Sequence, residues 1–205
     1  MDFLKTRLWI IMLLFSTTAN TQDFDSQLKA FANAYTFEAE GKYKEAINEL
    51  QKVYQEGSYE ISLRLGWLLY LDGRHTESLA HYQRCIEIRP LSAEARFGYV
   101  NPAASLGMWQ QVAVQYNEIL KAEPMNTLAN YRLGLMAYER EYFATALKYF
   151  DKVINLYPFD YDTAIMVAWT QYRLGKLREA RIMFQKALLI KPSDSSAAEG
   201  LKLIK

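Results

Sequence analysis

Apolar residues between positions 127 and 158 recur with the period of an α-helix. Tyr131, Leu135 and Tyr138 lie at i, i+4 and i+7, which places them on one helical face. A second run with helical spacing follows and consists of Phe143, Ala146, Leu147, Phe150, Val153 and Ile154. The segment is therefore predicted to form two helices. The small residues Gly134 and Ala146 would let the two backbones approach to the usual distance of about 8–10 Å.

The same pattern recurs along the chain with a period of 34 residues. Four of the five prolines are separated by this interval, namely Pro90, Pro124, Pro158 and Pro192. Each proline is expected to end the second helix of its unit, because it lacks an N–H and disfavours helix in the residue before it. Three further features align at fixed offsets before the prolines. They are a pair in the first helix (Leu65-Gly66, Tyr99-Val100, Leu133-Gly134, Val167-Ala168), a residue at the helix contact (Ser78, Val112, Ala146, Ala180) and an aromatic ring (Tyr82, Tyr116, Phe150, Phe184).

These offsets resemble the tetratricopeptide repeat, in which a large residue, Leu-Gly, Tyr, Ala, Phe and Pro occupy set positions of a 34-residue unit. The resemblance implies an all-α, right-handed superhelical solenoid of about five helix-turn-helix repeats. In this sequence the solenoid would span 22–192, with repeats at about 27–58, 59–92, 93–126, 127–160 and 161–192. Ser193 or Asp194 can cap a last helix within 193–205, which would cover the exposed end of the fifth repeat.

Two repeats contain a residue that conflicts with the pattern. Pro102 falls inside the first helix of the third repeat, where proline costs about 3 kcal/mol or more, so a kink or break is predicted there. The bend is either a local irregularity or a feature that admits a ligand. In the fourth repeat Glu141 stands in the turn between the two helices, so this turn is expected to be strained or differently built. The other repeats have glycine at this place: Gly41, Gly73, Gly107 and Gly175.

The N-terminal segment 1–21 has the pattern of a signal peptide. Lys5 and Arg7 precede the apolar run Leu8 to Phe15, and small and polar residues follow as far as Ala19 or Thr21, where cleavage is expected. The sequence therefore predicts an exported protein of bacterial envelope type, periplasmic or secreted. The alternative is an uncleaved segment that holds the chain at the membrane, although the apolar run is far shorter than the ~20 residues needed to span a bilayer.

Charge and residue chemistry narrow the possible functions. Without the 21 N-terminal residues, 22 basic and 22 acidic side chains remain, so a nucleic-acid partner is not expected. Cys85 is the only cysteine and is interpreted as a buried, inert thiol. His75 and His81 are expected at surface or turn positions without a metal. No catalytic motif is present, and Asp160 and Asp162 fall in a turn where solvated charge is expected. The protein is therefore predicted to be non-catalytic and to bind no cofactor.

The resemblance also implies where a ligand would bind. In this family the first helices of successive repeats line a concave groove, and ligand contacts come from set positions along them. Carrying the fifth, ninth and twelfth positions to this sequence gives fifteen residues, of which nine are aromatic. Aromatic rings offer large, stiff contact area, which suits peptide recognition. The alternative is that some of these rings only pack against the neighbouring helix. The candidate groove residues are Phe31, Tyr35, Leu63, Trp67, Tyr70, Asn101, Tyr131, Leu135, Tyr138, Trp169, Tyr172 and Arg173.

The predicted function is that of a non-catalytic scaffold that binds a peptide or protein segment in this aromatic groove. Chaperone-binding members of the family clamp a terminal carboxylate with Lys and Asn at set positions. In the first three repeats these positions hold Phe31, Tyr35, Arg64, Glu94 and Gly98, so a chaperone tail is not the expected partner. One alternative is a structural subunit of an envelope-associated assembly or of a homo-oligomer. Another is a cleft for carbohydrate or a small ligand.

Overall fold

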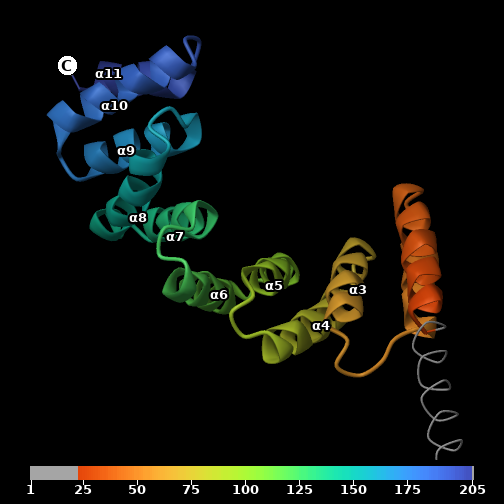
Figure 1. Cartoon of the computed structure of the whole chain (residues 1–205). Coiled ribbons are helices and arrows are strands. Elements are labelled where there is room, and N and C mark those ends of the chain that lie inside the picture. The colour runs from red at the N-terminus through yellow and green to blue at the C-terminus, as the bar shows by residue number, and fades with distance from the viewer. Residues whose placement is uncertain (1–22, 205) are drawn as a thin grey trace, which may run out of the picture. The chain divides into compact units, whose positions relative to one another are not determined.

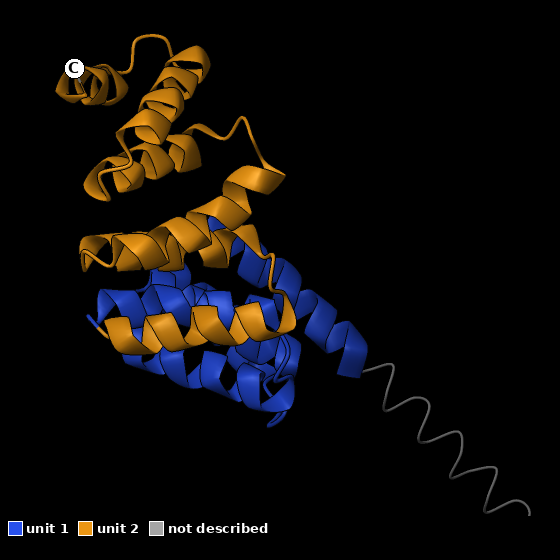
Figure 2. Cartoon of the chain, turned by 90° about the vertical axis from the view of Figure 1, so that its left-hand side faces the viewer, with its two compact units in different colours: residues 1–107 blue, residues 108–205 orange. Residues whose placement is uncertain are grey.

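The computed structural model describes residues 23–204, which form helices and turns and contain no strand. The predicted signal segment 1–21 lies outside the described residues. Figure 1 shows the helices in chain order, and Figure 2 colours the two compact units, which divide after Gly107. The all-α fold of helix-turn-helix repeats that the sequence predicts is confirmed.

The described part of the first unit begins with a helix over residues 23–39. It continues with α2 (Tyr43–Lys52), α3 (Tyr59–Leu71), α4 (His75–Ile88) and α5 (Ala93–Ser105). The second unit contains α6 (Trp109–Ala122), α7 (Thr127–Glu139), α8 (Phe143–Leu156), α9 (Tyr161–Arg173), α10 (Leu177–Ile190) and α11 (Ser195–Leu203). No helix within 23–204 is both long enough and apolar enough to cross a membrane.

In two hairpins, α3–α4 and α7–α8, a ring of the second helix lies on a glycine of the first helix. A Cβ added to Gly134 in α7 would lie only 2.5 Å from the Phe150 ring of α8, so only glycine fits at this distance. Ala146 and Phe150 are fully buried at this contact. The predicted close approach of the two helices is thus present, and the aromatic ring fills the space that a side chain on residue 134 would need.

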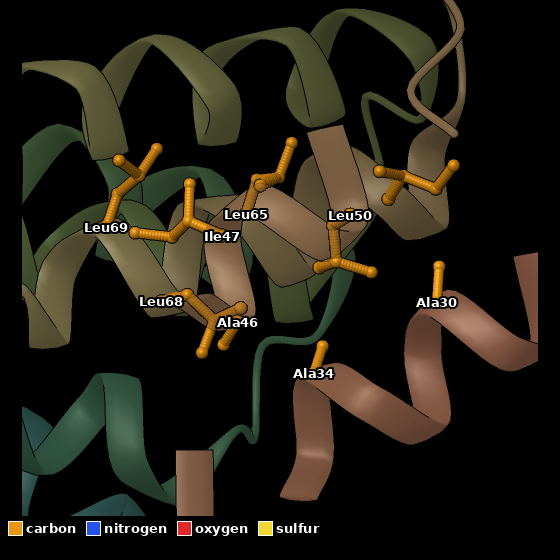
Figure 3. Packing of buried hydrophobic residues seen from close by; sticks show 9 residues of the cluster. Ala30, Ala34, Ala46, Ile47, Leu50, Leu65, Leu68 and Leu69 are labelled. Atoms are coloured by element: carbon orange, nitrogen blue, oxygen red, sulfur yellow. The ribbon is translucent and has the colours of Figure 1, made fainter. Parts of the chain in front are cut away.

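The first repeat packs in the same way, although its sequence is less regular. Ala34 stands in the helix over 23–39 at the place where the second and fourth repeats have Gly66 and Gly134, and it is fully buried. Figure 3 shows Ala30 and Ala34 facing the buried side chains of α2 and α3. These side chains include Ala46, Ile47, Leu50, Leu65, Leu68 and Leu69.

Helix α5 runs without interruption from Ala93 to Ser105, and Pro102 lies within it. Of the predicted kink or break, the break is therefore wrong, and the kink stays a prediction. Pro102 is the tenth of 13 residues, so its missing N–H leaves only the carbonyl of Gly98 without an intrahelical donor. The following backbone is satisfied, because the Leu106 N–H donates to the Pro102 carbonyl at 3.1 Å.

The last helix, α11, covers the end of the second unit. Asp194 caps it, since its carboxylate accepts a hydrogen bond of 2.7 Å from the Ala197 N–H. Ala197 and Ile204 are buried in a cluster with Phe184 of α10. A Cβ on Gly200 would lie 2.3 Å from the Phe184 ring, which shows how closely α11 approaches α10.

The turn between α7 and α8 has the backbone of a glycine turn but carries glutamate. Glu141 has a φ of 62°, close to the 71° of Gly175 in the next repeat. The hydrogen bonds also match, because the N–H of each residue donates to a carbonyl three residues earlier at 2.9 and 3.0 Å. The expected strain at Glu141 is confirmed, because the left-handed backbone conformation costs a non-glycine residue about 1–2 kcal/mol. The turn itself is not differently built.

Exchanging the residue types at these two turns should change stability in opposite directions. Glu141→Gly should raise the free energy of unfolding by about 0.5–1 kcal/mol by relieving backbone strain. Gly175→Ala should lower it by about 1 kcal/mol, and for backbone reasons alone, because a Cβ there meets no atom within 4 Å. Urea unfolding followed by circular dichroism measures both. If both variants changed the free energy of unfolding in the same direction, the backbone at Glu141 would not be strained as proposed.

Candidate functional site

A cavity of about 630 Å³ opens on the first unit. Side chains of the helix over 23–39, α3, α4 and α5 line it, so four helices of the unit build it together. Its volume falls in the range of ligand sites, roughly 300–1,000 Å³. The lining residues are Phe31, Tyr35, Tyr59, Glu60, Leu63, Arg64, Trp67, Tyr82, Arg89, Glu94, Phe97, Gly98 and Asn101.

Aromatic rings make up much of this lining. Phe31 and Tyr35 pair along one helix with ring centroids 6.4 Å apart, and Tyr35 keeps 54% of its surface exposed. Tyr82 is buried between α3 and α5, because Gly98 of α5 has no side chain and a Cβ there would lie 2.0 Å from the ring. Burial raises the pKa of Tyr82, so this phenol stays neutral at physiological pH. The site therefore offers ring faces and a neutral hydroxyl.

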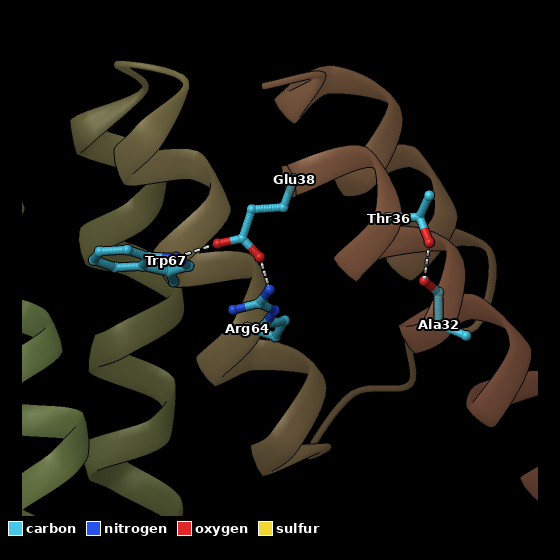
Figure 4. Close-up of polar contacts among 5 residues, drawn as sticks. All are labelled: Ala32, Thr36, Glu38, Arg64 and Trp67. Carbon is cyan, nitrogen blue, oxygen red and sulfur yellow. Dashed lines mark hydrogen bonds and ion pairs between the residues drawn. The ribbon is translucent and has the colours of Figure 1, made fainter. Parts of the chain in front are cut away.

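A polar network joins the first and second repeats at the wall of the cavity. The Glu38 carboxylate accepts a hydrogen bond of 2.7 Å from Trp67 Nε1 and pairs with the Arg64 guanidinium (Figure 4). The guanidinium also lies over the Tyr35 ring, 4.1 Å from its centroid. Burial lowers the pKa of Arg64. Glu38 thus holds both side chains in place, so the wall is ordered before any ligand binds.

A second ion pair lies at the more exposed side of the cavity. Arg89, the C-cap residue of α4, donates to Glu60 of α3 at 2.9 Å, and its guanidinium lies 4.1 Å from the centre of the Tyr59 ring. The Tyr59 hydroxyl is in turn 2.7 Å from the hydroxyl of Ser92, the N-cap of α5. More than half of each charged side chain is exposed, so this pair contributes little to stability.

The structure places the candidate groove residues of the first unit in two settings. Phe31, Tyr35, Leu63, Trp67 and Asn101 line the cavity. Tyr70 instead packs with its ring tilted against Trp67 and His75, at centroid distances of 5.8 and 5.6 Å.

The candidates of the second unit are half-buried, apart from the more exposed Arg173, and they contact other residues of that unit. Tyr138 packs edge-on against Phe143, with 5.3 Å between the centroids. Trp169 packs on Phe184 at 4.9 Å and donates from Nε1 to Ser196 at 2.8 Å. These contacts favour a packing role for these two rings.

The remaining candidates of this unit follow the same pattern. Arg173 lies over the Phe143 ring and pairs with Glu141, Tyr172 contacts Trp169, and Leu135 packs against the cluster around Phe150. Tyr131 packs on the Phe150 ring and also lines a smaller cavity of about 230 Å³.

Several lining residues were absent from the predicted groove. Tyr82 lies in the second helix α4 and Arg89 directly follows it, and the family pattern places the ligand contacts on first helices. Glu94 and Gly98 lie on α5, where Asn101 is the one candidate groove residue. Glu38, which orders Arg64 and Trp67, is the twelfth residue of its repeat and one of the fifteen family positions, although it is not among the candidate groove residues.

The other residues with potentially reactive side chains, Cys85, His81 and Asp160, lie outside the cavity lining. Cys85 is fully buried, and burial raises the pKa of its thiol to about 12, which agrees with an inert thiol. His81 is half-buried against the Tyr54 ring, and burial lowers its pKa. Asp160 caps α9 by accepting from the Thr163 N–H at 2.8 Å. Within residues 23–204, no cluster of His, Cys, Asp and Glu could hold a metal.

Comparison with known families decides what kind of protein this is. One family model described as "Tetratricopeptide repeat" matches residues 31–93 and 111–161, and a second with the same description matches residues 161–194. The chain belongs to the tetratricopeptide repeat family. No curated protein matches it.

Solved structures show the same tetratricopeptide repeat fold. A tetratricopeptide repeat protein from Parabacteroides merdae superimposes with a TM-score of 0.74 at 19% sequence identity, over 88% of this chain and 72% of that protein. A structure of the MamA protein gives 0.70 at 18% identity, over 82% and 93% of the two chains. A double mutant, MamA RS-1, gives 0.72 at 17% identity, over 83% and 98%. Identities this low establish similarity of fold only.

The two ion pairs of the cavity should differ in their effect on stability. Glu38→Gln should lower the free energy of unfolding by about 1–3 kcal/mol, because Arg64 would lose its counter-charge in a mostly buried position. Glu60→Gln removes the same charge from the exposed pair with Arg89 and should cost at most about 1 kcal/mol. Urea unfolding at low and high salt measures both. Similar losses for the two variants would show that the Glu38 network does not order the wall.

Proposed function

We propose that this tetratricopeptide repeat protein is a non-catalytic scaffold whose first unit binds a peptide or protein segment of a partner. The observation that supports this most is the ring-lined cavity of about 630 Å³ between the helix over 23–39, α3 and α5. The Tyr82 ring, packed on Gly98, forms the floor of the cavity, and Glu38 holds Arg64 and Trp67 in its wall. Because these side chains are already held in place, little side-chain entropy is lost when a ligand binds. The family assignment supports protein partners in general.

A variant that fills the cavity tests this proposal. Asn101 is exposed and lines the cavity, so Asn101→Trp should occupy the space with little effect on the fold. A random-peptide library selected on the wild-type chain supplies the ligands, and the fluorescence anisotropy of labelled peptides measures their affinity. The affinity should fall at least about tenfold, because the apolar contact area is lost. Asn117→Trp, an exposed change on α6, is the matched control and should bind as the wild type does. Unchanged binding in Asn101→Trp would reject the cavity as the site.

A second candidate function, a subunit of a homo-oligomer, is favoured by exposed apolar residues on the second unit. They lie at the turn between α6 and α7 and at the turn between α8 and α9, and Leu128 and Tyr157 line the same small cavity. Large apolar side chains gathered on a surface mark an interaction site more often than isolated ones do. The residues, with their exposed fractions, are Met125 (47%), Leu128 (46%), Leu156 (48%), Tyr157 (58%) and Phe159 (69%).

Light scattering coupled to size exclusion distinguishes this second candidate. If two copies join through these residues, the wild type should elute with the mass of an oligomer, and Phe159→Ser should shift it toward the monomer. Ile182→Ser changes an apolar residue of α10 with 56% exposure and is the matched control. A wild-type chain that stays monomeric over a wide concentration range would exclude the homo-oligomer.

A further inference from the structure

The charged side chains of the cavity in the first unit are not balanced. Arg64 pairs with Glu38, and Arg89 pairs with Glu60 at 2.9 Å, so each cation already has a counter-charge. Glu94 is the remaining charged residue of the lining. Among residues 23–204 its carboxylate has no ion pair or hydrogen-bond partner, and the side chain is exposed. The cavity therefore carries one uncompensated negative charge.

This carboxylate belongs to the cavity and not to the outer surface alone. Glu94 lies in the first turn of α5, one helical turn before Phe97 and Gly98, and all three line the cavity. Burial is the main cause of the raised pKa of Tyr82, and the negative charge of Glu94 raises it further. The negative charge of Glu94 therefore acts on the Tyr82 ring, which forms the floor of the cavity.

We infer that the cavity selects a segment that inserts a lysine or arginine side chain, with its methylene stem against the rings and its charge at Glu94. This inference rests on the proposed function of the same site. A basic side chain combines an apolar stem with a cationic head, which matches a ring-lined cavity that ends in one carboxylate. A neutral or acidic side chain would cover Glu94 and leave its charge without a partner, which disfavours binding.

Pairs of peptides that differ only in one charge provide the test. Peptides are selected from a random library on the wild-type chain, and each lysine or arginine is then replaced in turn by norleucine, which keeps an unbranched stem and removes the charge. At the residue that enters the cavity, this change should weaken binding by about five- to tenfold at low salt. In Glu94→Gln the lysine and norleucine peptides should bind alike. Glu179→Gln removes one charge from the exposed start of α10 and should keep the wild-type preference.

The outcomes separate the inference from the proposed function. Peptides that bind the wild type, lose affinity in Asn101→Trp and show no preference for a basic residue would overturn the inference and leave the proposed function intact. A preference for basic residues that persists in Glu94→Gln would overturn the assignment of Glu94. If no peptide of the library is retained, both the inference and the proposed function are wrong.

Discussion

The structure depends on close contacts between an aromatic ring of a second helix and a glycine of a neighbouring helix. Phe150 lies on Gly134 within one hairpin, and Tyr82 and Phe184 lie on Gly98 and Gly200 of the following helix. In each case a Cβ would come within 3.0 Å of the ring, so the helices could not approach as they do with any other residue. Since a single hairpin leaves one face of its ring uncovered, each repeat needs its neighbour to complete the core.

The same contact shapes the cavity of the first unit. The Tyr82 ring belongs to the core, yet its neighbour Gly98 has no side chain, so the ring also forms part of the cavity lining. Around it, Glu38 fixes Arg64 and Trp67, and Arg89 fixes Tyr59. Cations that are held over ring faces and neutralised by carboxylates make a rigid wall, which leaves the charge of Glu94 available to a ligand.

Equivalent residues of the two units have different surroundings. Trp67 and Trp169 occupy the same position of their repeats, but the Trp67 indole donates to Glu38 of the preceding first helix, whereas the Trp169 indole donates to Ser196 of the following one. Trp169 also packs on Phe184. At the same position of the repeat, Trp67 therefore lines the cavity, whereas Trp169 packs against the core. The difference comes from the neighbouring repeats and not from the position itself.

The sequence by itself determined the features that arise within one hairpin or recur with the 34-residue period. Helix spacing, the ring-on-glycine contact, the strained turn at Glu141 and the burial of Cys85 all follow from residues close in the chain or from the repeat. Only the tertiary structure decided that α5 continues through Pro102 and that Arg89, Tyr82 and Glu94 share a cavity with Trp67. The physical reason is that pairs such as Glu38 with Arg64 and Glu60 with Arg89 join side chains on different helices, whose meeting depends on how neighbouring helices pack.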